Sequence, residues 1–470
     1  MVLVRDFSSL YQCHFCVLNK KTEVNLCYNE IAKTHWKKVT SMDNNTRKLL
    51  GITDPNIKFS DNWLLSNNKK QITRWSIMGT LTYKPKACPN CGAVNNHSIT
   101  KHGFCTVCHP FGLFRRQPLD LKINTQRFYC HLCHTTFMAT SPLFDANTSI
   151  SKALRHEIVL RLTRVESIKD IADDLGISAS TVQRTVISLA NQITIPSRNY
   201  LPEILCIDEF KSMRSVSGKM SFIAVDGDRH ELFEILEDRR LYKLFNHYQS
   251  FSRKARENVK YLVMDMNSSY DQLVKQVFPN AQIVYDRFHI IKHLNDTMNH
   301  VRIHVYNRLR RGNSLDQKRA RRLKHYWRLF LKPFEELSNR PYYEGRYFKR
   351  EVTSKTILNL LLEYDDELNA TYQYIQELVR CYHHHKVHHF LELLHKRIPG
   401  VSHYTSHRCH NLFRRRAGIK RGLTFAFSNG QTEGFNNLIK LIKRIAFGYR
   451  NFTTFKTRIY LIINHKITVK

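Results

Sequence analysis

The spacing of hydrophobic residues changes several times along the chain, and each change predicts a different kind of structure. Between residues 84 and 140, apolar residues alternate with polar ones, as in a small hairpin. From about 151 to 191 they recur every three to four residues, which predicts three short helices. Strands and helices alternate from 201, and residues 291 to 422 are almost wholly helical and strongly basic. The pattern therefore predicts a multidomain chain of α+β class.

The three helices expected between residues 151 and 191 have the layout of a helix-turn-helix. Gly176 ends the second helix, and Ser178 can cap the third. This layout is typical of DNA-binding domains, although an ordinary three-helix packing unit is the alternative. The outward-facing residues of the third helix that can reach bases or phosphates are Ser180, Thr181, Gln183 and Arg184.

Two apolar runs in the next segment each end in an acid. Residues 204–207 (ILCI) lead into Asp208, and residues 259–264 (VKYLVM) lead into Asp265. Such runs are typical of buried strands, and a carboxylate at their end is held rigidly at the rim of a sheet. The order of three strands, helix, strand, helix, strand is that of an RNase H-like α/β fold, in which the first and fourth strands are neighbours. We therefore expect the two aspartates to be neighbours, with the adjacent Glu209 on the opposite face of its strand.

A third candidate acid, Glu433, lies in the first turn of a predicted amphipathic helix. Asn429 is a plausible cap, and the positive end of the helix dipole favours a carboxylate there. One face carries Glu433, Asn437, Lys440 and Arg444, and the opposite face is apolar. A surface helix with a capping glutamate is the alternative. Together with the two strand acids, Glu433 would suit two Mg²⁺ (or Mn²⁺) ions, which clamp an in-line displacement at phosphorus.

Two C-x-x-C pairs flank the predicted hairpin. Cys88 and Cys91 form the first pair, and Cys130 and Cys133 form the second. Two such pairs complete a tetrahedral zinc site, which usually has a structural role. A redox C-x-x-C is the alternative, but it would need a βαβ setting that the pattern does not predict.

The other N-terminal cysteines give weaker signals. Cys105 and Cys108 form a third C-x-x-C pair, which is a candidate second zinc site. Cys13, Cys16 and Cys27 are irregularly spaced, so free or buried thiols are the better interpretation for them.

The charge balance points to a polyanionic partner. The chain of 470 residues has 74 Lys and Arg against 39 Asp and Glu, a formal net charge of +35. No apolar segment approaches the length of a membrane-spanning helix, and the N-terminus lacks the layout of a signal peptide. We therefore expect a cytoplasmic, nucleoid-associated protein with reduced thiols. In the basic helical segment, aromatic residues such as Trp327 favour a nucleic-acid surface, although a solvated charged face is the alternative.

Six ordered motifs resemble those of bacterial insertion-sequence transposases, specifically the ISL-three group of DDE transposases. The motifs are 207–210 (IDEF), 264–267 (MDMN), 278–281 (FPNA), 286–289 (DRFH), 429–437 (NGQTEGFNN) and 443–452 (KRIAFGYRNF). The resemblance covers the chain from about residue 84 onward, but Cys105/Cys108 are not a hallmark of the group.

The resemblance implies the catalytic triad Asp208, Asp265 and Glu433, with a helical insertion before the glutamate. It further implies binding to the terminal inverted repeats of a mobile element, metal-dependent cleavage and joining of double-stranded DNA, and a homo-oligomer, at least a dimer on DNA. An aromatic residue in such an insertion can brace unstacked DNA, and Trp327 is a candidate. The other expected DNA contacts are Lys440, Lys443 and Arg444.

Six segments follow from these patterns. They are an N-terminal region of unclear fold (1–83), a zinc-binding module (84–140), a helix-turn-helix (150–195), the first part of an RNase H-like catalytic domain (200–298), a large all-helical insertion (299–422) and C-terminal helices with the third acid (423–470). Two other functions fit the same segments: a transposase-derived DNA-binding regulator without catalysis, and an RNase H-like structure-specific nuclease.

Overall fold

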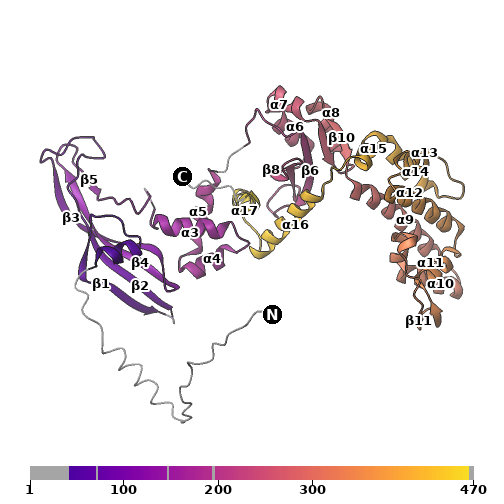
Figure 1. Ribbon diagram of the computed structural model, residues 1–470, viewed down its shortest axis with the longest axis horizontal. Coiled ribbons are helices and arrows are strands. Elements are labelled where there is room, and N and C mark those ends of the chain that lie inside the picture. The colour runs from indigo at the N-terminus through magenta and orange to yellow at the C-terminus, as the bar shows by residue number, and fades with distance from the viewer. Residues whose placement is uncertain (1–41, 70–71, 146–147, 193–195, 465–470) are drawn as a thin grey trace, which may run out of the picture. The chain divides into compact units, whose positions relative to one another are not determined.

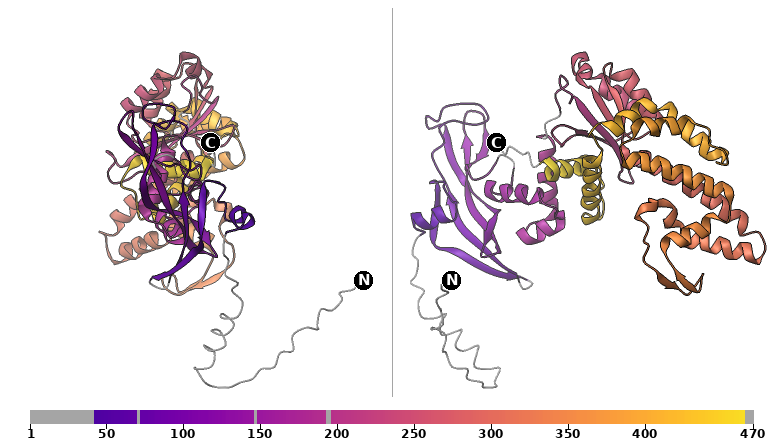
Figure 2. Two further views of the ribbon diagram at one scale, coloured as in Figure 1. Left: turned by 90° about the vertical axis from the view of Figure 1, so that its left-hand side faces the viewer. Right: turned by 45° about the vertical axis from the view of Figure 1, so that its right-hand side comes forward.

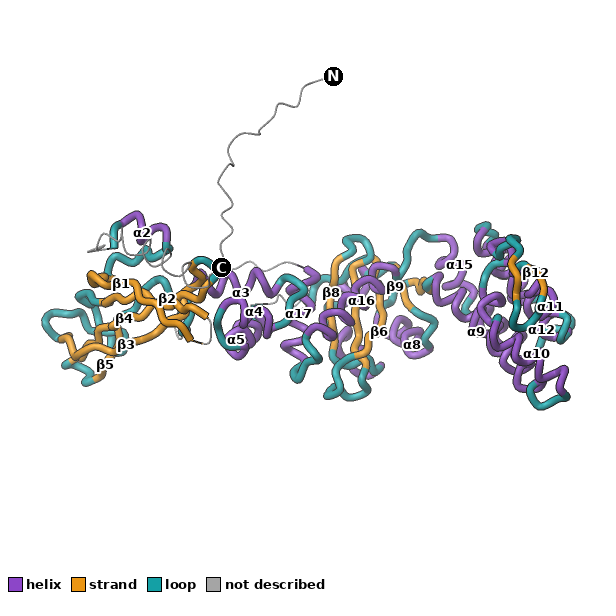
Figure 3. The backbone as a smooth tube through the Cα atoms, turned by 90° about the horizontal axis from the view of Figure 1, so that it is seen from below, coloured by secondary structure: helices purple, strands orange, loops and turns teal. Residues whose placement is uncertain are grey.

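The computed structural model describes residues 42–69, 72–145, 148–192 and 196–464. They form two compact units, one of residues up to 157 together with 174–177, and one of residues 158–173 together with 178 onward. Figures 1 and 2 colour the elements along the chain, and Figure 3 separates strands from helices. Within the described ranges, no helix combines the length and apolar character needed to cross a membrane. Cys13, Cys16 and Cys27 lie outside these ranges.

The first unit is built on a five-stranded sheet in the order β1-β2-β4-β3, with β5 also paired to β4. Its elements are α2 (Asn44–Leu49), β1 (Ile57–Lys69), β2 (Ile72–Leu81), β3 (Ile99–Phe114), β4 (Gln117–Cys130) and β5 (Thr135–Met138). Arg115 and Arg116 join β3 to β4 with positive φ of 50° and 63°, which a two-residue hairpin of type I′ requires. The buried residues Leu119, Leu121 and Ile123 confirm the predicted alternation in β4.

The hairpin between the cysteine pairs is larger than the sequence suggests. Its strands have 16 and 14 residues, and β1 and β2 extend the same sheet from a region whose fold the sequence leaves unclear. Local alternation of apolar residues did not predict the larger sheet, because β2 pairs in parallel with β4, which lies about 40 residues further along the chain.

Three helices follow the first sheet. They are α3 (Lys152–Leu162), α4 (Ile168–Leu175) and α5 (Ala179–Ala190). Gly176 has a φ of 63°, which ends α4 as predicted, and Ser178 Oγ accepts a hydrogen bond from Thr181 N at 3.2 Å, which caps α5. Val182 and Val186 are fully buried and form part of the apolar face of α5.

The second unit contains a five-stranded sheet in the order β10-β9-β6-β7-β8. Its strands are β6 (Ile204–Lys211), β7 (Met220–Asp226), β8 (Glu231–Leu236), β9 (Tyr261–Met264) and β10 (Gln282–Tyr285). The first three strands form an antiparallel meander, whereas β9 pairs in parallel with both β6 and β10. The neighbouring positions of β6 and β9 confirm the predicted pairing of the two acid-bearing strands.

Each face of this sheet is covered by a different set of helices. The first set is α6 (Leu241–Gln249), α7 (Arg253–Asn258) and α8 (Ser268–Val277), and the second is α16 (Gly430–Ile445) and α17 (Phe452–Asn464). Leu205 and Ile207 of β6 pack in the core with the first set. Ile204 and Cys206 pack in the core with α16 and α17, as strand alternation requires. The last helices of the chain therefore complete a sheet whose strands come much earlier.

Between β10 and α16 the chain forms a helical block. Its helices are α9 (Arg287–Leu309), α10 (Ser314–His325), α11 (Ser354–Leu362), α12 (Asp366–His383), α13 (Val387–His395), α14 (His403–Arg414) and α15 (Arg416–Thr424), with short 3-10 turns η1 (Trp327–Leu331) and η2 (Phe334–Glu336). The expectation of an all-helical insertion is wrong, because β11 (Tyr342–Glu344) and β12 (Arg350–Val352) form a hairpin. The Glu344 carboxylate accepts hydrogen bonds from three backbone N–H groups of the intervening turn and so holds the hairpin.

Candidate active site

Three carboxylates lie in one row at the ends of three neighbouring parallel strands. Asp208 is near the end of β6, and Asp265 and Asp286 directly follow β9 and β10. The residues two places earlier, which face each other across the three strands, are Cys206, Val263 and Val284. These three belong to the core beneath α16 and α17, so alternation places the three carboxylates on the face that α16 covers.

His289 joins two of these acids. Its Nδ1 lies 2.6 Å from Asp265 Oδ1 and 3.2 Å from Asp286 Oδ2. Burial lowers the pKa of His289, but the bonds to the two carboxylates outweigh it and raise the pKa to about 9. The imidazolium therefore offsets part of the negative charge at neutral pH. The sequence analysis missed this role, although the i, i+3 spacing of Asp286 and His289 at the start of a helix was an available signal.

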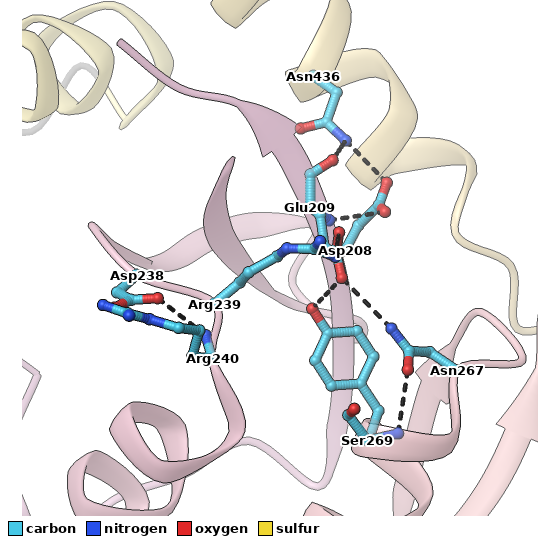
Figure 4. A network of polar contacts seen from close by, with 9 residues as sticks. Asp208, Glu209, Asp238, Arg239, Arg240, Asn267, Ser269 and Asn436 are labelled. Atoms are coloured by element: carbon cyan, nitrogen blue, oxygen red, sulfur yellow. Dashed lines mark hydrogen bonds and ion pairs between the residues drawn. The ribbon is translucent and has the colours of Figure 1, made fainter. Parts of the chain in front are cut away.

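Asp208 is held from the far end of the chain. Its Oδ2 accepts a hydrogen bond from Asn436 Nδ2 at 2.7 Å, across 228 positions of sequence (Figure 4). Burial raises the pKa of Asp208 to about 6, and the charge of Asp265 acts in the same direction. A carboxyl group with this pKa is poised to ionise fully when a cation binds beside it.

Helix α16 is fixed to the sheet through Asn429. Its Nδ2 donates to Ile207 O at 3.1 Å, and its backbone N donates to Asp286 Oδ1 at 3.2 Å. Asn429 occupies the N-cap position, but its side chain makes no capping hydrogen bond, contrary to the expectation from the sequence. The bond that Nδ2 donates to the buried Ile207 carbonyl orients the side chain toward β6, and Oδ1 makes no hydrogen bond to a described residue.

The buried stripe of α16 is also rotated from the predicted one. The sequence places Phe435, Leu438, Ile442 and Ile445 on the apolar face, of which only Ile442 is fully buried. The buried residues are Thr432, Asn436, Ile439 and Ile442. Asn436 is buried although it is polar because its amide group bonds to Asp208, which an apolar side chain could not do.

Glu433 lies in the first turn of α16, as predicted, and its side chain is exposed. It is three positions before Asn436, so the two side chains occupy adjacent positions on the helix surface. Asn437, Lys440 and Arg444 are exposed too, so the expected polar face of the helix is present. The first turn of α16 thus brings a carboxylate to the side of the helix next to the group that binds Asp208.

The backbone N of Glu209 donates to Asp208 Oδ1, but the Glu209 carboxylate has other partners, on the opposite face of β6 (Figure 4). It accepts a hydrogen bond from Tyr270 Oη at 2.7 Å, forms an ion pair with Arg239, and lies 3.5 Å from Asn267 Nδ2. Its position confirms the prediction that alternation turns it away from Asp208. Asp226 accepts hydrogen bonds from the backbone N–H groups of Asp228 and Arg229 in the turn after β7 and so has a structural role.

The chemistry of this site suits an oxygen-binding metal ion. Buried side-chain oxygens without a hydrogen bond within the described ranges include Asn429 Oδ1, Thr432 Oγ1 and Asn436 Oδ1. Asp265, Asp286 and His289 also form a group whose ligand atoms lie within 4.8 Å of one another. Carboxylate and amide oxygens are the ligands that Mg²⁺ prefers. Unbonded buried oxygens are costly, and a cation would satisfy them.

The first unit brings the four expected cysteines together. The sulfurs of Cys88, Cys91, Cys130 and Cys133 all lie within 4.8 Å of one another, close enough to hold one metal ion. A hydrogen bond from Thr135 lowers the pKa of the Cys133 thiol to about 6, which favours the thiolate that a metal requires. 

Cys105 and Cys108 are placed differently. Both are exposed on β3, and they lie apart from the four-cysteine group.

The expected DNA contacts occupy several surfaces of the second unit. Ser180, Gln183 and Arg184 are exposed on α5, and Thr181 is half-buried. Lys443 is tied to the sheet, because its Nζ donates to the carbonyl oxygens of Lys211 at 2.8 Å and Ser212 at 3.1 Å.

Trp327 begins η1 in the helical block. Its side chain is 37% exposed, and the guanidinium of Arg328 lies 5.4 Å from its ring centre.

Comparison with known proteins agrees with this arrangement. Residues 205–459 match the ISL-three family of DDE transposases, described as "Transposase", and residues 149–186 match a homeodomain-like domain. The chain is 25% identical over 262 residues to the transposase of insertion sequence element IS1001 from Bordetella parapertussis, covering 53% of this chain and 58% of that protein. It is 34% identical over 122 residues to a Lactococcus lactis subsp. lactis protein named "ATP-dependent protease", covering 25% of this chain and 39% of that protein.

The chain therefore spans well under two thirds of the length of either relative. The match named as a protease covers only a quarter of this chain, so the name is not transferred. The transposase match covers more than half of the chain and includes both strand acids and the glutamate of α16. The protein is a member of the ISL-three family of insertion-sequence transposases.

Proposed function

We propose that this protein binds the terminal inverted repeats of its insertion sequence and catalyses metal-dependent cleavage and transfer of DNA strands. The observation that carries the proposal is the bond between Asp208 and Asn436, which ties the strand acids to the helix that bears Glu433. In this proposal Asp208, Asp265 and Glu433 are the catalytic acids, on an RNase H-like domain formed by residues 200–298 and 423–470. Residues 299–422 are an insertion in that domain.

Two Mg²⁺ or Mn²⁺ ions bound by these acids would activate the attacking oxygen and stabilise the leaving oxygen of an in-line displacement. The protein residues fix the acids in place. Asn436 orients Asp208, His289 orients Asp265, and Asn429 sets the start of the Glu433 helix against the sheet. Rigid support of this kind is what preorganised metal ligands require.

Other parts of the chain would deliver the DNA. Residues 150–195 would bind the element ends through α5, and the cysteine module at 84–140 would hold a structural Zn²⁺ at Cys88, Cys91, Cys130 and Cys133. Two or more copies on DNA would bring two ends together in the bacterial cytoplasm. The net charge of +35 supports DNA as the partner, because DNA is a polyanion.

The test is cleavage of DNA fragments that carry the element ends, with Mg²⁺ present or removed. Asp208→Asn, Asp265→Asn and Glu433→Gln should each lower the cleavage rate by about 1,000-fold or more. Metal stabilisation is worth several kcal/mol, and each ~1.4 kcal/mol is tenfold in rate. DNA binding should persist in all three variants. Asp228→Asn is the matched control, because Asp228 is an exposed acid in the turn after β7.

Persistent cleavage by the Asp208→Asn protein would show that the acids are wrongly assigned. Binding without cleavage by the unaltered protein would instead favour a DNA-binding regulator. Cleavage without transfer of pre-cut ends to target DNA would favour a nuclease.

A further inference from the structure

The turn between α16 and α17 exposes an aromatic residue in a strained conformation. Phe447 is 100% exposed, more than any other large hydrophobic residue described. Its φ is 51°, in the left-handed region that bulky residues rarely adopt. Such a left-handed conformation costs about 1–2 kcal/mol, and no packing against the described residues offsets that cost.

The backbone of this turn explains the strain. Phe447 N donates to Arg444 O and Gly448 N donates to Lys443 O, both at 3.0 Å. These two bonds make a Schellman cap, in which the left-handed position is usually glycine. Here a phenylalanine occupies it, and Gly448 comes one residue later with a φ of 98°. The cap forms with the ring directed into solvent, so the aromatic side chain is not needed for folding.

The same turn lies beside the helix-turn-helix. A hollow of about 610 Å³ is lined by residues 445–451, by the start of α4 and by Ala179 and Gln183 of α5. Gln183 is an exposed residue on the helix expected to contact bases. DNA held by α5 would therefore lie next to the ring of Phe447.

Helix α16 also relates Phe447 to the candidate active site. Glu433 and Phe447 are 14 positions apart, which is about 20 Å at 1.5 Å per helical residue. That length corresponds to about 6 base pairs of B-DNA at 3.4 Å each. Lys440 and Arg444 are exposed between the two, so the helix offers cations along this path.

We propose that Phe447 inserts between bases of the element end, about 6 base pairs from the phosphate that the acids attack. Apolar wedges of this kind unstack a base step for a few kcal/mol and bend the duplex. DNA is favoured over another protein chain because exposed cations (Lys440, Arg444, Arg450) flank the ring and α5 lines the same hollow. The inference rests on the proposed function and assigns to Phe447 a further role, the distortion of the DNA substrate.

The experiment places 2-aminopurine, a base that brightens when unstacked, at successive positions of an element end. Full-length Asp208→Asn protein is used, so that the DNA is bound but not cut. Fluorescence should rise severalfold at a position about 6 base pairs from the mapped cleavage point. Phe447→Ala in the same background should abolish the rise, and Phe447→Trp should keep it. Tyr343→Ala is the control, because Tyr343 is an aromatic residue exposed to 68% in the β11–β12 hairpin.

Two further measurements separate a wedge from a structural role. Phe447→Gly should leave the melting temperature unchanged or raise it, since glycine relieves the left-handed strain. With Asp208 intact, Phe447→Ala should cut duplex ends at least tenfold more slowly, and a mismatch at the bright position should restore the rate.

Other outcomes would overturn the inference. An unchanged fluorescence profile in Phe447→Ala would exclude a wedge, and a loss of self-association without DNA would assign the ring to a protein interface. If the unaltered protein cuts the ends but shows no bright position, only this inference fails. If the unaltered protein neither binds nor cuts the element ends, the proposed function is wrong, and the inference about Phe447 is wrong with it.

Discussion

Arg458 of α17 offers a stringent test of how the helix-turn-helix is attached to the sheet-bearing part of the second unit. Its side chain is only 1% exposed, and its guanidinium donates to the carbonyl oxygens of Leu162, Arg164 and Glu166. These carbonyls lie at and just after the C-terminus of α3, where the helix dipole favours a cation. One buried side chain thus binds three backbone carbonyl groups at the end of α3.

Replacing this arginine with methionine keeps much of the side-chain length and removes the charge and every donor. A hydrogen bond to a charged group contributes about 1.5–3 kcal/mol, but the three bonds share one side chain and do not add fully. A buried carbonyl left without its donor costs about 1–3 kcal/mol, so the expected effect of Arg458→Met on three such groups is about 3–4 kcal/mol. Arg458→Lys should fall in between, because one ammonium cannot match the fork of the guanidinium.

Native-state hydrogen exchange of the full-length protein measures this effect locally. Amides of α3 to α5 should exchange about 100- to 1,000-fold faster in Arg458→Met, since each ~1.4 kcal/mol is tenfold. Arg253→Met is the matched control, because its side chain is 82% exposed and its ion pair with Glu257 lies on the surface. Exchange in Arg458→Met that stays within threefold of the unaltered protein would refute the idea that Arg458 holds these helices.

Three further predictions follow from particular contacts. Asn436→Ala should raise the Mg²⁺ concentration for half-maximal cleavage by about 10- to 100-fold, as loss of a ligand-orienting bond does, and an unchanged Mg²⁺ titration would contradict this. Cys130→Ser, or zinc chelation, should unfold the first unit while α8 to α16 keep their exchange protection; full retention of the β-sheet circular dichroism would argue against a structural metal. Gly422→Ala should lower the melting temperature by several degrees, because its Cβ would lie 2.0 Å from Tyr285 O, whereas Gly434→Ala, with nothing within 4 Å, should not.

The parts of the site that could be predicted are those that depend on strand periodicity. Asp208 and Asp265 each end an apolar run, and parallel neighbours end at the same edge, so their proximity followed from the order of elements. The separation of Glu209 followed from alternation alone. These inferences needed no knowledge of how helices pack.

The supporting residues could not be predicted in the same way. Thr432 and Asn436 are polar, so an amphipathic pattern assigns them to the outside of α16, yet both are buried, and Asn436 bonds to Asp208. Their burial depends on the rotation of the helix about its axis, which the hydrogen bonds of Asn429 fix. The strands β1 and β2 were not predicted for another reason. Polar residues interrupt their apolar pattern, and β2 pairs with the distant parallel strand β4.

Helix α16 bonds to strand β6 but is synthesised much later, and this delay determines when the candidate active site can form. Ile207 and Asn429 are 222 positions apart, and a ribosome adds about 5–20 residues per second, so roughly 10 to 45 seconds separate their synthesis. During that interval Asp208 lacks its amide partner, and the apolar sheet face that α16 and α17 later cover is open. Arg458, which fastens the helix-turn-helix, emerges later still. Under the proposed function, a nascent chain that lacks α16 would be unable to cut DNA, and synthesis must pass Arg458 before the candidate site and the helix-turn-helix are joined.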